Sequence, residues 1–318
     1  MFFRPDVEVR FLPKRNSWAL VFLAVLPGLV SAPAYSTHSC LPRAYAMPDL
    51  LEIKQAGFLV ASDVERNSLA VALLDCIAEP DPVLRDGVVY EGISTWLRSR
   101  ALSPETIDIL YTRLSEKITG ESDADGFQQP FAALILSEVA RSDRIDPAFT
   151  AARRDELTGL AAGYLSGVQD YRGFSATEGW RHGVAHGADL VLQLVLNPNI
   201  DEIQIRRLMS AVAAQVAPAG DVFYHYGEPE RLAHAVFYAW QRGVVEDRFW
   251  SDWFEAISSA QPLDNWQAAF TSQAGLAKRH NSLAFLLVMH LNASASDDER
   301  ARGLDSMVMQ AIKRVLGG

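Results

Sequence analysis

Two histidines and an aspartate lie at helical spacing in the stretch RHGVAHGADL, residues 181–190. His182 and His186 are four residues apart, and Asp189 follows three residues later. Two imidazoles at this spacing can reach one zinc ion, with a carboxylate one turn further on as a third ligand. In metalloprotease helices a glutamate follows the first histidine, but in this sequence that position is Gly183, so the protease motif is absent.

The same three side chains also have two simpler interpretations. A helix over 177–195 would place them on one face and would put Trp180 on the opposite, apolar face. We therefore expect Trp180 to be buried. The polar stripe would then line a binding groove without any metal, or it would be solvated and bond only to the next helix. A divalent metal is the only cofactor that the spacing suggests.

Further charged residues precede this stretch and occur in two other places. For Asp170 and Arg172 the alternatives are an Arg–Asp pair that fixes the loop and a guanidinium presented to an anion. Glu228 and Arg231 lie three residues apart at an expected helix start, where an intrahelical ion pair is the common explanation. We expect Arg172, Arg85 or Glu228 to approach the histidines. The whole candidate polar face comprises Arg85, Asp86, Asp170, Arg172, His182, His186, Asp189, Glu228 and Arg231.

Three blocks are the most distinctive parts of the sequence. They are DPVLRDGVVYEGISTWL at 81–97, DYRGFSATEGWRHGVAHGADL at 170–190 and YGEPERLAHAV at 226–236. They resemble a bacterial family, domain of unknown function 2785, whose pattern includes every residue of the candidate polar face. The segment FQQPFAALILSE at 127–138 departs from that pattern. The resemblance implies a helical fold and a shared polar face, and it implies no particular activity.

Composition excludes one class of partner. The 318 residues include 29 Lys and Arg against 39 Asp and Glu, a formal charge of −10, and no run of five basic residues occurs. Because phosphate binding needs a concentrated basic surface, nucleic acid is not an expected partner. No G-x-S-x-G, Gly-rich phosphate loop or C-x-x-C occurs either. A protein or a small polar ligand is the expected partner.

Residues 1–34 are typical of a secretory signal peptide. Two basic residues precede the apolar run WALVFLAVLPGLV, and Ala32 and Ala34 fit the small-residue rule for cleavage before Tyr35. The run is shorter than the roughly 20 residues that a membrane span needs. We therefore expect a periplasmic or secreted protein with no membrane span after cleavage. An uncleaved N-terminal anchor is the alternative.

Cys40 and Cys76 are the only cysteines in the sequence. In an oxidising compartment an even pair suggests one disulfide, which would tie the mature N-terminal segment to a helix. The alternative is two unpaired thiols, with Cys76 as one more apolar residue of its helix. Spacing leaves both open because it does not show proximity.

Apolar residues recur at intervals of three and four from residue 48 onward, and no convincing alternation marks a strand. Prolines stand near expected helix starts beside residues that favour a first turn, as in LSPE at 102–105 and GEPE at 227–230. The pattern predicts an all-α fold, an irregular, HEAT-like α-solenoid of stacked antiparallel helix pairs, with a compact multi-helix bundle as the alternative. No linker divides 35–318, which we expect to be a single domain.

Two functional hypotheses follow. The first is an exported protein that binds a protein or a small polar ligand along the polar face. The second is a hydrolase in which His182, His186 and Asp189 hold a metal or exchange protons, while Arg172 orients an anionic substrate. Convergence of the charged residues in one concavity would favour a site, and separate local pairs would favour a structural role.

Overall fold

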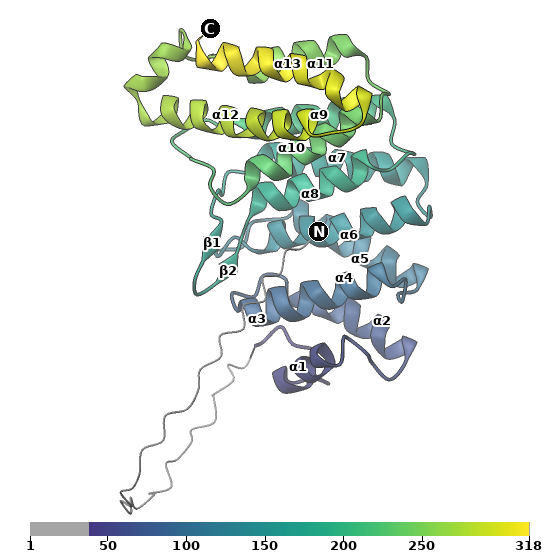
Figure 1. Ribbon diagram of the computed structural model, residues 1–318. Helices are drawn as coiled ribbons and strands as arrows, with labels where there is room; N and C mark the ends of the chain where they lie inside the picture. The colour runs from purple at the N-terminus through teal and green to yellow at the C-terminus, as the bar shows by residue number, and fades with distance from the viewer. Residues whose placement is uncertain (1–37, 318) are drawn as a thin grey trace, which may run out of the picture. The chain divides into compact units, whose positions relative to one another are not determined.

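Helices make up nearly all of the regular structure in residues 38–317, which are the residues that the computed structural model describes. The all-α class predicted from the sequence is confirmed (Figure 1). The predicted signal peptide, 1–34, and the predicted first mature residue, Tyr35, lie outside the described residues. Among residues 38–317, no helix combines the length and the apolar character that a membrane span requires.

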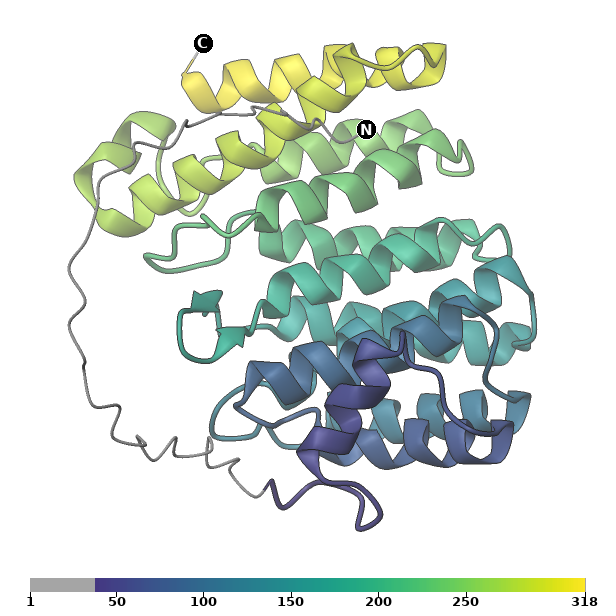
Figure 2. The same ribbon diagram turned by 60° about the horizontal axis from the view of Figure 1, so that its bottom comes forward.

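The helices form two layers, and within each layer they are stacked in the order in which they occur along the chain (Figures 1 and 2). In the first layer each helix packs on the next: α2 (Asp63–Ala72), α5 (Pro104–Thr119), α7 (Ala151–Gly167), α9 (Glu202–Val216) and α11 (Asp247–Ile257). The second layer is built in the same way from α4 (Glu91–Arg98), α6 (Gln128–Ile145), α8 (Gly183–Val195), α10 (Glu228–Gln241) and α12 (Gln273–Ser294). Contacts of α5 with α6, α7 with α8 and α9 with α10 join the layers.

The remaining elements pack at the two ends of the stack. At one end α13 (Glu299–Leu316) packs on α10, α11 and α12, and the 3₁₀ turn η3 (Trp266–Thr271) packs on α12. At the other end α1 (Met47–Gln55) contacts the π-helical turn η2 (Arg85–Tyr90), which follows η1 (Leu73–Cys76) and α3 (Pro82–Leu84). Neighbours in the chain are thus neighbours in the stack, as expected for stacked helix pairs. The HEAT-like geometry of those pairs stays a prediction.

Local sequence explains where the helices begin. Ser103 Oγ accepts a hydrogen bond of 3.2 Å from the backbone N–H of Thr106, at the start of α5. Asp201 and Gln204 form a reciprocal capping box at the start of α9. The apolar stripes of these helices are buried in the core, where several side chains are fully buried: Leu110, Leu136, Leu190, Ile205 and Val236.

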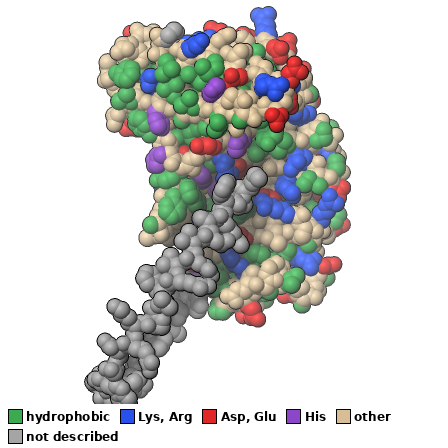
Figure 3. All heavy atoms as spheres, in the orientation of Figure 1, with side chains coloured by type: hydrophobic (Ala, Val, Ile, Leu, Met, Phe, Trp, Pro, Cys, Tyr) green, Lys and Arg blue, Asp and Glu red, His purple; other side chains and the backbone are tan. Residues whose placement is uncertain are grey.

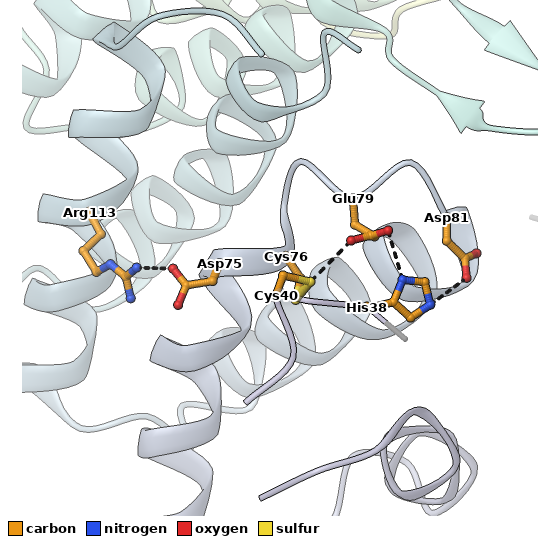
Figure 4. Close-up of a disulfide and its surroundings, with 7 residues drawn as sticks. All are labelled: His38, Cys40, Asp75, Cys76, Glu79, Asp81 and Arg113. Atoms are coloured by element: carbon orange, nitrogen blue, oxygen red, sulfur yellow. Dashed lines mark hydrogen bonds and ion pairs between the residues drawn. A yellow bond between two sulfur atoms is a disulfide. The ribbon is translucent and has the colours of Figure 1, made fainter. Parts of the chain in front are cut away.

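A disulfide attaches the first described residues to the stack (Figure 4). The sulfur atoms of Cys40 and Cys76 are 2.08 Å apart, and their Cα atoms are 5.1 Å apart. His38 adds to this attachment because its two ring nitrogens lie 2.9 Å from the Glu79 carboxylate and 3.4 Å from the Asp81 carboxylate. The segment before α1 is therefore held against the turn that follows η1.

Candidate functional site

The stretch 177–195 is not one continuous helix, so this part of the sequence-based prediction was wrong. A short antiparallel hairpin of β1 (Phe174–Ser175) and β2 (Gly179–Trp180) comes first, and α8 begins only at Gly183. The backbone prevents a longer helix because Gly179 and His182 have φ angles of 73° and 57°, in the left-handed region. In both views the hairpin lies at the same edge of the stack as the α9–α10 connection (Figures 1 and 2).

Trp180 is consequently not buried opposite the histidines. It belongs to β2, keeps 38% of its surface exposed, and stacks on His182 with ring centroids 4.7 Å apart. Trp180 and Tyr226 also form an edge-to-face ring contact, with centroids 5.9 Å apart. Trp180 and His182 therefore lie together beside the start of α8.

His182 is held in one tautomer by the loop before α10. Its Nε2 lies 2.8 Å from the backbone carbonyl of Tyr226. Because a carbonyl only accepts, Nε2 carries the proton and Nδ1 of the neutral ring is an acceptor. Nδ1 makes no hydrogen bond with the described residues and is not fully buried, so it can reach a ligand. Burial lowers the pKa of His182 to about 4, with the charge of Arg231 acting in the same direction.

His186 lies one turn further along and is almost fully buried. Its ring packs against Phe131 and His182, with centroids 5.3 Å and 5.7 Å away, and its Nδ1 is buried without a hydrogen-bond partner among residues 38–317. The pKa of His186 is lowered to about 3, chiefly by burial and in part by the charge of the neighbouring His182. Both imidazoles are therefore neutral at pH 7.

Asp189 pairs with Arg231 of α10 and not with the histidines. Nη1 of Arg231 donates to both carboxylate oxygens, at 2.7 Å and 2.6 Å. Nε and Nη2 of Arg231 make no hydrogen bond with the described residues, and its side chain is 47% exposed. Burial raises the pKa of Asp189, while Arg231 opposes the rise. The charge of Arg231 also lowers the pKa of both histidines.

These three side chains do not form the metal site that the spacing suggested. His182 uses Nε2 for the Tyr226 carbonyl, and Asp189 faces Arg231. The Nδ1 atom of His186 is enclosed next to Phe131. Within residues 38–317, no three His, Cys, Asp or Glu side chains come together in a way that could hold a metal ion.

Arg85 lies beneath the hairpin, and its charge also acts on the buried His186 ring, whose pKa it lowers. It is fully buried, its Nε donates to Asp86 at 2.9 Å, and its Nη2 donates to the Glu178 carbonyl at 2.6 Å. Its guanidinium also lies over the ring of Phe127, 3.8 Å from the centroid. Arg85 and Asp86 therefore support the hairpin that carries Trp180.

Asp170 and Arg172 form the local pair that was one of the two alternatives. Arg172 Nε lies 2.8 Å from the nearer Asp170 oxygen, and its Nη2 donates to the Asp125 carbonyl at 3.1 Å. Arg172 also lines two cavities, of about 930 Å³ and about 580 Å³.

Glu228 does not pair with Arg231, because it accepts a hydrogen bond from the backbone N–H of Tyr226 at 2.9 Å. This bond orients the Tyr226 carbonyl, which binds His182.

Neighbouring residues of η2, α4 and α6 extend this surface. Arg98 Nε donates to Glu138 at 2.9 Å, and Tyr90 interacts electrostatically with that pair and with the Asp189–Arg231 pair. Figure 3 shows histidine side chains on this face close to a group of Lys and Arg side chains. The role of Tyr226 has no signal in the sequence, because this residue contributes a backbone carbonyl.

Comparison with known proteins adds a family but no activity. A family model described as Protein of unknown function (DUF2785) matches residues 114–291. The second and third distinctive blocks fall within this range, whereas 81–97 precedes it. No curated protein and no solved structure matches the chain. Since the family match covers more than half of the chain, the protein belongs to the family described as Protein of unknown function (DUF2785).

Proposed function

We propose that the protein binds a small polar ligand bearing a carboxylate, at a surface made by His182, Asp189 and Arg231. The observation that carries this proposal is the set of hydrogen bonds that Arg231 makes. Asp189 holds it through Nη1, while Nε and Nη2 form no hydrogen bond within the described part of the chain and the side chain is half exposed. A carboxylate accepts two parallel hydrogen bonds from such a guanidinium edge. A hydroxyl beside that carboxylate would donate to Nδ1 of His182. The matching ligand is therefore a hydroxy acid.

The pKa values of the histidines favour binding over the alternative of acid–base hydrolysis. A general acid or base works best when its pKa lies near the working pH. With a pKa of about 4, His182 is protonated in only about one molecule in a thousand at pH 7. The still lower pKa of His186, about 3, makes that ring a weaker base again. Both rings suit the role of neutral hydrogen-bonding groups.

The test is an NMR titration of the ¹⁵N-labelled protein with glycolate and with acetate. We expect both acids to shift the Arg231 Nε resonance, and glycolate to bind more tightly because its hydroxyl also reaches Nδ1 of His182. Arg231→Gln should weaken glycolate binding by about tenfold or more, since charge-assisted hydrogen bonds are lost. The matched control is Arg207→Gln, which removes another Arg–Asp ion pair, the one with Asp155, on the first layer of helices.

Two results would contradict this function. One is glycolate affinity that Arg231→Gln leaves unchanged, and the other is no shift at Arg231 with either acid. An acidic peptide that binds where both small acids fail would point to a protein partner instead.

We further propose that the protein is exported and processed to begin near Tyr35. The Cys40–Cys76 disulfide supports this, because disulfides persist in oxidising compartments and are rare in the cytosol. N-terminal sequencing of the protein recovered from the periplasmic or secreted fraction is the test. A membrane-bound product that retains Met1 would favour an uncleaved anchor.

A further inference from the structure

The Cys40–Cys76 disulfide lies next to the turn of residues 79–82 (Figure 4). Cys40 Sγ is 3.5 Å from a Glu79 carboxylate oxygen, and His38 lies between the carboxylates of Glu79 and Asp81. Asp81 also caps the short helix α3 by accepting from the backbone N–H of Val83 at 2.8 Å. The covalent bond and these contacts therefore hold one turn from two directions.

The backbone of that same turn holds Arg85. Nη1 of Arg85 donates to the carbonyl of Glu79 at 2.9 Å and to the carbonyl of Pro80 at 3.1 Å. These are the acceptors that satisfy this nitrogen inside the protein, where Arg85 has no exposed surface. A shift of the turn would leave Nη1 of this buried guanidinium without its acceptors, which is strongly unfavourable.

The other side of Arg85 holds the hairpin of the proposed site. Its Nη2 donates to the Glu178 carbonyl at 2.6 Å, across 93 residues of sequence. The ring of Phe127 packs against two guanidinium groups, that of Arg85 at 3.8 Å and that of Arg181 at 4.3 Å. Arg181 in turn donates to the Glu178 carboxylate at 3.2 Å. The hairpin then continues directly into His182.

We infer that Arg85 is a positioning residue that couples the Cys40–Cys76 disulfide to the hairpin beside the ligand surface. Opening the disulfide releases the 79–82 turn, Arg85 loses its fixed acceptors, and the hairpin becomes mobile. The opening step is a reduction: a dithiol supplies two electrons and two protons, the S–S bond becomes two thiols, and the dithiol closes to its own cyclic disulfide. The functional meaning of this coupling rests on the proposed function, because the hairpin positions His182.

Hydrogen–deuterium exchange of the full mature chain tests the coupling without any ligand. Two backbone bonds report on the hairpin, Arg181 N–H to the Gly173 carbonyl at 2.9 Å and His182 N–H to the Arg172 carbonyl at 3.2 Å. After reduction with dithiothreitol we expect these amides to exchange about tenfold faster, while amides of α12 stay protected. Circular dichroism checks that the reduced chain remains helical. The Cys40→Ser/Cys76→Ser variant should behave as the reduced protein does.

A second pair of variants separates coupling from general loosening. In Arg85→Lys the hairpin should exchange fast in both redox states, because lysine cannot bridge Glu79, Pro80 and Glu178 at once. The control Arg172→Gln disturbs the same loop through Asp170 but does not touch the 79–82 turn, so it should keep the response to reduction. If Arg85→Lys fails to fold, the comparison of oxidised and reduced wild-type protein still decides.

Two outcomes would overturn the inference. In the first, reduction speeds exchange in residues 38–46 but leaves the hairpin amides unchanged. In the second, reduction accelerates the hairpin of Arg85→Lys as much as that of the wild type. Neither outcome depends on glycolate, so failure of the coupling and failure of the proposed function are separately visible.

Discussion

The buried, neutral state of His186 predicts a specific loss of stability in acid. Its pKa falls from the usual 6.5 to about 3 in the folded protein, mainly through burial. Because the folded pKa is the lower one, the unfolded chain takes up the proton first as the pH falls. Stability is therefore fully present above pH 6.5 and is lost progressively as the pH falls from 6.5 toward 3.

The size of the loss follows from the two pKa values. At pH 5 the unfolded chain has bound almost one proton at this position, whereas the folded protein has bound almost none. The interval between 6.5 and 5 is 1.5 pH units, which at about 1.4 kcal/mol per unit gives about 2 kcal/mol from His186 alone. That is a large fraction of the 5–15 kcal/mol by which domains are typically stable.

Urea unfolding at pH 7 and pH 5 measures this loss in wild type and in His186→Gln. Carboxylates and the remaining histidines titrate in both proteins, so their contributions cancel in the comparison. We expect the variant to lose about 2 kcal/mol less than the wild type over this interval. An equal loss in the two proteins would refute the reasoning, because it would mean that the His186 ring is protonated as easily in the fold as in the unfolded chain.

Two further predictions concern packing and a buried acid. Gly173→Ala should destabilise the protein by about 1–3 kcal/mol, because the added Cβ would lie 2.0 Å from the Tyr226 ring. Thermal denaturation measures this loss against the control Gly163→Ala on α7. There the added Cβ would meet no described atom within 4 Å, so the substitution should raise the stability by up to about 1 kcal/mol. Asp143→Asn should lower the free energy of unfolding in urea by about 3 kcal/mol. The nearly fully buried Asp143 carboxylate accepts two hydrogen bonds from Arg154 and two from backbone N–H groups. An unchanged urea midpoint would contradict this prediction.

The helices could be predicted because their determinants are local. A capping residue such as Ser103 acts within one turn, and an apolar stripe of period 3.6 needs a second layer to cover it. The hairpin before α8 could not be predicted in this way. Its two strands have two residues each, and distant groups stabilise it, chiefly Arg85 from below and the Asp125 carbonyl through Arg181.

The residues of the candidate site could likewise be predicted only where local sequence determines their positions. Helical spacing placed His186 and Asp189 on α8, but it could not show that Arg231, 42 residues away, would take the carboxylate. The expected Glu228–Arg231 pair does not form either, because Glu228 accepts a local hydrogen bond from the Tyr226 backbone N–H while Arg231 pairs with Asp189 of α8. Asp170 and Arg172 pair locally, whereas Asp189 pairs across helices, and sequence spacing alone does not distinguish the two cases.

The position of Arg85 bears on which part of the chain makes up the functional unit. The family match begins at residue 114, whereas Arg85, the 79–82 turn and the disulfide all precede it. Arg85 nevertheless makes its shortest hydrogen bond to Glu178, within the matched range. A buried guanidinium needs all of its acceptors, so the hairpin and the turn must keep a fixed separation for either to be well ordered. The disulfide-bonded N-terminal part therefore belongs to the structure that positions Trp180 and His182, and a fragment that began at residue 114 would lack the group that holds the hairpin.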